Sequence, residues 1–148
     1  MFRRECFEAI DGYVPIKSGG VDLIAVLTAR VKGWETKTFV EKCFMHHRSQ
    51  GGALHTGLRE RLHMGRKDYL LGNHPLWEIF RSCYQMTHKP YFIGGVLVLA
   101  AYLWNTACGV EKTITGELQT LRRNDQLKRL RLVIQRRLLP LVPLQSKR

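Results

Sequence analysis

The first part of the chain alternates short helical patterns with turns. The opening residues 1–10 predict a helical turn or two, which residues 11–15 end with turn chemistry. After a glycine-containing loop, apolar residues recur every three or four positions over 22–31. Gly33 then stands where a left-handed C-terminal cap belongs, so a second helix is predicted over this range.

The next segments favour strand and then helix. Residues 34–47 are rich in β-branched and aromatic side chains, which predicts one or two short strands. Two glycines at 51–52 interrupt this pattern. Leucines at every fourth position over 54–62 then mark one face of a short, basic helix.

A helix is predicted over 75–87, because Pro75 suits the first helical position and the apolar residues share one face. These apolar residues are Leu76, Ile79, Phe80, Cys83 and Tyr84. A basic amphipathic helix is predicted over 118–139, ahead of Pro140.

Residues 91–110 carry no charged side chain, and their number matches the length of a membrane-spanning helix. Both flanks are basic, which disfavours a full span by the positive-inside rule. A re-entrant or interfacial helix at a membrane fits the pattern, and a buried core helix remains the alternative.

Composition changes the picture mainly through charge. The 148 residues include 24 Lys and Arg against 12 Asp and Glu, a net charge of +12, and 45% of them are hydrophobic. The length and hydrophobic content predict one folded unit. The charge predicts an anionic partner: nucleic acid, a membrane surface or a phosphorylated ligand. Because the aromatic residues of 91–110 lie apart from the arginines of the tail, we favour the membrane over nucleic acid.

The spacing of the cysteines disfavours a zinc site, because structural zinc usually draws ligands from close pairs. The four are Cys6, Cys43, Cys83 and Cys108. With no secretory signal ahead of them, a reducing compartment is expected. The sequence contains neither a Walker loop nor a Gly-x-Gly-x-x-Gly turn, and no two aspartates are two residues apart.

Two groups of residues could carry chemistry. Asp22 lies at a glycine-rich loop and a predicted helix start, where a carboxylate stays ionised and can act as a general base. The same position also suits a plain helix cap. His46, His47 and Arg48 could bind a diphosphate or give one ligand to a metal, or they form a solvated polar turn.

An ordered set of motifs covers residues 1–65. It begins with Phe2-Arg3-Arg4 before a short helix and with the turn Gly12-Tyr13. Gly20-Val21-Asp22 follows, eleven residues before Gly33-Trp34. The set ends with a strand that stops at His47 and with Arg48-Ser49-Gln50-Gly51. The set resembles the C-terminal half of the catalytic domain of a family 2 glycosyltransferase. Its last motif resembles the Arg-x-x-Gly of members that act on lipid-linked acceptors.

The resemblance implies a partial α/β GT-A fold, mostly helical in this chain with one or two short strands and with the nucleotide-binding half missing. It implies that Asp22 is the base that deprotonates the acceptor hydroxyl, although Val21 occupies the place of the family's usual Glu. The other implied site residues are His46, His47 and Arg48 on the donor side, and Arg3, Arg4, Gly19 and Gly20 on the acceptor side. A divalent metal, Mg or Mn, is implied for the complete domain, with His47 as a third ligand.

The expected organisation is an acceptor-side part over 1–72, apolar membrane-associated helices over 73–110 and a basic helix and tail over 111–148. The expected function is transfer of a sugar from a nucleotide-sugar donor to a lipid-linked or polysaccharide acceptor by inverting displacement, at the cytoplasmic face of a membrane. The chain is expected to be a truncated frame or split subunit that is inactive without the missing half. The alternative is a basic membrane- or nucleic-acid-binding module without chemistry.

Overall fold

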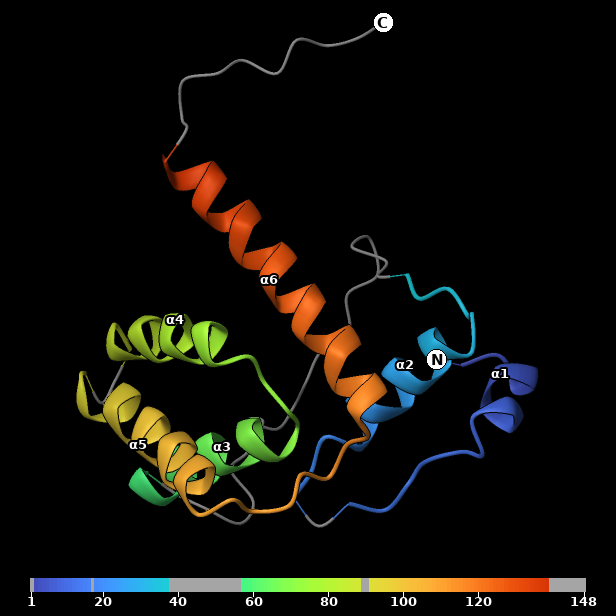
Figure 1. Ribbon diagram of the computed structural model, residues 1–148, viewed down its shortest axis with the longest axis horizontal. Helices are drawn as coiled ribbons and strands as arrows, with labels where there is room; N and C mark the ends of the chain where they lie inside the picture. Colours follow the sequence, from blue (N-terminus) through green and yellow to red (C-terminus); the bar gives the residue numbers. More distant parts are fainter. Residues whose placement is uncertain (1, 17, 38–56, 89–90, 139–148) are drawn as a thin grey trace, which may run out of the picture.

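The computed structural model describes residues 2–16, 18–37, 57–88 and 91–138, and within these ranges it contains helices and no strand. The helices are α1 (Arg4–Ala9), α2 (Val21–Val31), α3 (Leu58–Leu70), α4 (Pro75–Met86), α5 (Ile93–Ala107) and α6 (Gly116–Leu138). Figure 1 shows α3, α4 and α5 gathered into one group, with α1 and α2 on the other side of the long helix α6.

The first helix packs on the second through small side chains. Cys6 and Ile10 are buried against Ala25 and Ala29 of α2. Both predicted turns are present: Asp11 and Gly12 have positive φ angles, and Gly33 has φ 83° after the end of α2. The predicted helix over 22–31 and its left-handed cap are therefore confirmed.

Two glycines let α5 pack closely against its neighbours. A Cβ atom at Gly65 of α3 would lie 2.1 Å from the carbonyl oxygen of Val98, and one at Gly95 would lie 2.3 Å from the carbonyl oxygen of Ser82. No side chain fits at either crossing, so the helix backbones are in contact there. This close packing makes α3, α4 and α5 one helical layer.

The two groups of helices meet where α3 ends. Ile24 and Leu27 of α2 pack with Leu71, which follows α3, and with Ile114 and Leu118 at the start of α6. On the outer side of the same contact, the Arg30 guanidinium pairs with the carboxylate of Asp125. A small core and one ion pair thus fix α6 on α2.

Helix α4 buries polar side chains and exposes its apolar ones, the opposite of what its sequence pattern suggests. His74 caps this helix, with its Nδ1 accepting a hydrogen bond of 3.2 Å from the Leu76 amide. Its fully buried side chains are those of Glu78 and Ser82. The apolar residues predicted to share one face are exposed: Leu76, Ile79, Phe80, Cys83 and Tyr84. This arrangement leaves an apolar outer face on α4.

The expected α/β GT-A fold is wrong for the described part of the chain, which is helical and has no sheet. Of the range expected to form strands, residues 34–37 make no strand, and residues 38–47 lie outside the described residues. β-Favouring composition alone does not specify a strand, because a strand needs a partner to pair with.

Two helix boundaries also differ from expectation. The basic helix expected over 54–62 begins at Leu58 and continues to Leu70, and its Leu58 and Leu62 are exposed rather than buried. The uncharged segment 91–110 contains the 15-residue helix α5. None of the described helices combines the length and the apolar character that crossing a membrane would require.

Candidate functional site

The loop before α2 determines the setting of Asp22. Gly19 and Gly20 have φ angles of 76° and 95°, a left-handed conformation that favours glycine. Gly20 is the N-cap residue, and no side chain caps the helix. Asp22 lies in the first turn with an exposed side chain and is not the cap residue. Its carboxylate faces solvent at the positive end of the helix dipole.

Helix α3 holds this loop in place from below. The alkyl chain and Nζ of Lys67 lie within 4 Å of the position a Cβ would take at Gly19. A Cβ at Gly20 would approach Leu71 Cδ1 to 2.7 Å. Both glycines are thus favoured by their backbone conformation, and Gly20 also by its close contact with Leu71.

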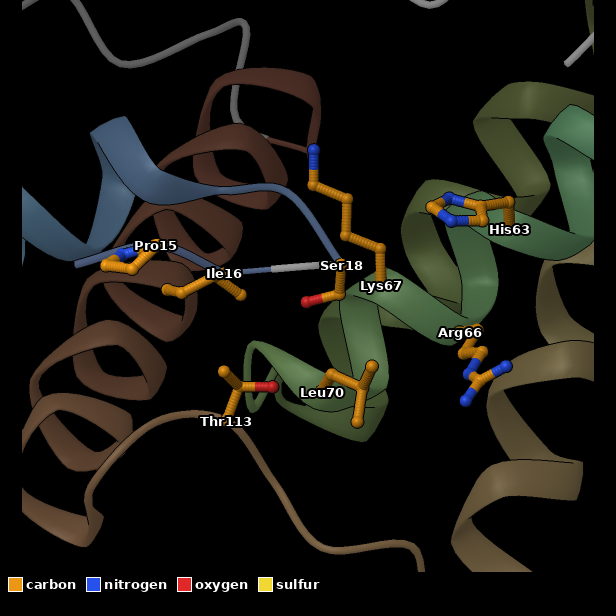
Figure 2. Close-up of a pocket in the computed structure, with 8 residues that line it drawn as sticks. All are labelled: Pro15, Ile16, Ser18, His63, Arg66, Lys67, Leu70 and Thr113. Atoms are coloured by element: carbon orange, nitrogen blue, oxygen red, sulfur yellow. The ribbon is translucent and has the colours of Figure 1, made fainter. Parts of the chain in front are cut away.

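A cavity of about 420 Å³, here called the Ser18 pocket, opens beside the same loop (Figure 2). Its lining residues come from the loop before α2, from α3 and from the segment before α6: Pro15, Ile16, Ser18, His63, Arg66, Lys67, Leu70 and Thr113. The loop that leads into Asp22 therefore forms one wall of this pocket.

The Ser18 pocket combines positive charge with hydroxyl groups. Arg66 and Lys67 form no ion pair within the described ranges, so their charges are available to an anion. The hydroxyl of Ser18 is buried without a hydrogen-bond partner among the described residues. Figure 2 shows the hydroxyls of Ser18 and Thr113 turned into the space between the loop and α3. A polar, anionic molecule suits these groups.

Of the other residues predicted for the site, Arg3 and Arg4 do not line this pocket. Arg3 and Arg4 lie exposed at the start of α1, where Arg4 Nε pairs with Glu8 Oε1 at 2.8 Å. His46, His47 and Arg48 lie outside the described residues. Gly19 and Gly20 are the predicted acceptor-side residues that the structure brings beside the cavity.

The described residues contain no group of three His, Cys, Asp or Glu side chains able to hold a metal ion. His47, the residue that the resemblance assigns to the metal, is outside these ranges.

A buried polar network, which the sequence did not indicate, connects the α3–α4 turn with α6. Asn73 Oδ1 accepts hydrogen bonds from Arg122 Nε at 2.7 Å and Gln126 Nε2 at 2.6 Å, while its amide donates to Glu78 Oε2 at 3.0 Å. Tyr102 donates to the Asn73 carbonyl at 2.8 Å. These bonds anchor α6 to the turn between α3 and α4.

Burial shifts the ionisation of this network. The pKa of Glu78 rises to about 7, mainly because burial disfavours the charged carboxylate and secondly because Asp68 is negative. Burial also lowers the pKa of Arg122. Asp68 is itself paired with the Arg81 guanidinium. Because the network is enclosed and ties three helices together, we regard it as structural.

Comparison with known proteins adds no further identification: no family model, no curated protein and no solved structure matches this chain.

Proposed function

We propose that this chain supplies the acceptor side and the catalytic base of a family 2-like glycosyltransferase. The observation that carries the proposal is the setting of Asp22: its carboxylate is exposed in the first turn of α2, and Gly20 rather than Asp22 caps the helix. The carboxylate makes no capping hydrogen bond, so it is open to an acceptor while it also interacts favourably with the helix dipole. The Ser18 pocket beside the same loop offers a place for an acceptor.

In the proposed reaction, Asp22 takes the proton from an acceptor hydroxyl. The oxygen attacks the anomeric carbon of a nucleotide sugar, the bond to the nucleoside diphosphate breaks, and the configuration inverts. Binding and activation of the donor, including any divalent metal, are assigned to a nucleotide-binding half.

The proposal places this site at a membrane, on the cytoplasmic leaflet. Support comes from exposed aromatic side chains: Tyr84 of α4, Phe92 before α5 and Trp104 of α5 are 59%, 72% and 72% exposed. Aromatic side chains of this kind favour the boundary between lipid headgroups and hydrocarbon. A helix lying in that boundary does not need the length of a membrane span.

A second candidate function is attachment to an anionic membrane without chemistry. The same exposed aromatic side chains favour it, together with exposed basic residues of α6. These basic residues are Lys128, Arg129 and Arg131. The two candidates differ in what they require of Asp22, because a surface-binding module has no use for its carboxylate.

The test joins this chain to a family 2 nucleotide-binding half and follows transfer from labelled UDP- and GDP-sugars to a membrane lipid extract. Asp22→Asn should lower kcat about 10²- to 10⁴-fold, the usual contribution of a general base, and leave the donor KM nearly unchanged. The matched control is Asp11→Asn, since Asp11 is exposed and its positive φ suits asparagine. It should change kcat less than about twofold, far below a general-base effect.

Loss of rate in Asp22→Asn counts only if the variant folds. Its free energy of unfolding should stay within about 1 kcal/mol of the parent, since one exposed charge near a helix end contributes no more than that. Full kcat in Asp22→Asn would show that Asp22 is not the base. No transfer by the parent chimaera, with vesicle binding retained, would replace the enzyme by the surface-binding module.

A further inference from the structure

A second cavity lies between α3 and α5. It has a volume of about 590 Å³ and is here called the Trp104 groove. Its lining residues come from α3 and α5: Arg59, Leu62, His63, Arg66, Ala100, Ala101, Trp104 and Asn105. The groove thus follows the contact between these two helices.

The Trp104 groove and the Ser18 pocket share two residues of α3. His63 and Arg66 line both cavities. In Figure 2 the Arg66 side chain extends away from Ser18, toward the neighbouring helix, while Lys67 passes beside the Ser18 loop. The two cavities are therefore neighbours along α3, which rises about 17 Å between Arg59 and Leu70.

The two cavities differ in the chemistry of the residues that line them. The Trp104 groove has an apolar side, because Trp104 is 72% exposed and Leu62 is 43% exposed beside the small Ala100 and Ala101. Its edge is cationic: Arg59 and Arg66 are exposed and form no ion pair with the described residues. The Ser18 pocket adds Lys67 and hydroxyl groups beside the Asp22 loop.

We propose that the two cavities form one site for an anionic lipid acceptor, with the hydrocarbon end in the Trp104 groove, a phosphate between Arg59 and Arg66, and the hydroxyl end in the Ser18 pocket. This inference rests on the proposed function for its direction toward Asp22, and it narrows the acceptor from any lipid or glycan to a phosphate-bearing amphiphile. Charge complementarity selects this occupant: an uncharged lipid leaves both arginines unpaired, and a soluble phosphate leaves the apolar side empty.

The experiment uses the full chain and three short-chain probes below the concentrations at which they form micelles. Dihexanoyl phosphatidylglycerol carries the phosphate anion, the tails and free hydroxyls, dihexanoyl phosphatidylcholine has the same tails but no net charge, and glycerol phosphate has no tails. Titration calorimetry should give the anionic lipid an affinity at least about tenfold higher than either comparator, since only it satisfies both the cationic edge and the apolar side.

Variants separate the two parts of the site. Arg59→Gln with Arg66→Gln should weaken binding of phosphatidylglycerol about 20- to 30-fold, because each arginine near an anionic headgroup contributes about fivefold. The control pair Lys128→Gln with Arg131→Gln also removes two exposed charges but lies on α6. Its affinity for the dispersed lipid should equal that of the parent, because the membrane surface for which these α6 residues are proposed is absent from this experiment. Trp104→Ala should weaken the binding of both lipids but not that of glycerol phosphate.

Three results would overturn the inference: equal affinity for the two lipids, equal affinity for glycerol phosphate and phosphatidylglycerol, or unchanged binding in the arginine pair. Failure to bind lipid in a chain whose transfer still depends on Asp22 would refute this site alone. Binding with no dependence of transfer on Asp22 would refute the proposed function alone.

Discussion

Asn73 donates a hydrogen bond of 3.0 Å from its side-chain amide to Oε2 of Glu78, whose carboxyl group is fully buried. The other oxygen, Oε1, has no partner among the described residues. A carboxyl group with one hydrogen bond and no solvent is held in its neutral form more readily than in water.

The free energy of unfolding should therefore depend on pH through the buried carboxyl group of Glu78. The pKa of Glu78 is raised from 4.5 to about 7, so the folded chain holds the proton more tightly than the unfolded chain. Its stabilising effect is complete below pH 4.5 and is lost as the pH rises through 7, a fall of roughly 3 kcal/mol in the free energy of unfolding. Urea denaturation at pH 4.5 and 7.5 measures it.

Glu78→Gln should remove most of that pH dependence, because the amide does not ionise. Glu111→Gln, at an exposed position, is the control and should retain it. Parallel pH profiles for the parent and Glu78→Gln would mean that the raised pKa is wrong.

Gly65→Ala should destabilise the fold by roughly 1–3 kcal/mol, because its methyl group would lie 2.1 Å from the Val98 carbonyl oxygen and force α3 away from α5. Gly116→Ala is the matched control: nothing lies within 4 Å of its Cβ position. Helix propensity then makes Ala neutral or stabilising by up to about 1 kcal/mol. Thermal denaturation of both variants decides whether the helices are in contact at Gly65.

The Arg30–Asp125 pair should couple α2 to α6 by about 0.5–1 kcal/mol in a double-mutant cycle of Arg30→Gln and Asp125→Asn. The value is modest because both side chains remain about one-quarter to one-third exposed. The Arg4–Glu8 pair, 90% and 61% exposed, serves as reference and should show less. Equal coupling energies for the two pairs would show that Arg30 and Asp125 are as exposed to solvent as Arg4 and Glu8.

Because the apolar face of α4 is exposed, substitutions on it should weaken vesicle binding while leaving the stability of the fold nearly unchanged. Ile79→Ser with Tyr84→Ser should change the free energy of unfolding by less than about 1 kcal/mol, because both side chains are about half exposed. The same variant should co-sediment less with anionic vesicles, since it removes apolar surface from the face that we propose lies at the membrane. A loss of several kcal/mol would show that this face packs inside the protein.

The spacing of apolar residues predicted where helices lie better than it predicted which of their faces is buried. Over 22–31 the apolar spacing and Gly33 predicted both the helix and its cap, because the relevant interactions lie within a few residues. For 75–87 the same spacing located a helix but not the side that faces the core. Periodicity identifies an apolar face, but it does not say whether protein or lipid covers it.

The buried network could not be read from the sequence for a different reason. Asn73, Glu78 and Arg122 come together only when α6 crosses the α3–α4 turn, and Asn73 and Arg122 are 49 positions apart. Each residue alone resembles an ordinary surface residue. The Ser18 pocket likewise depends on α3 and the segment before α6, so the sequence suggested Gly19 and Gly20 without Lys67 or Thr113.

The exposure of Trp104 gives the protein a built-in optical reporter. It is 72% exposed, whereas the other two tryptophans, Trp34 and Trp77, are partly buried. An indole in water emits at longer wavelength than one in hydrocarbon, so Trp104 governs the red edge of the emission spectrum. Contact of the Trp104 groove with lipid would therefore shift the emission to the blue without any label, and Trp104→Phe would abolish the shift.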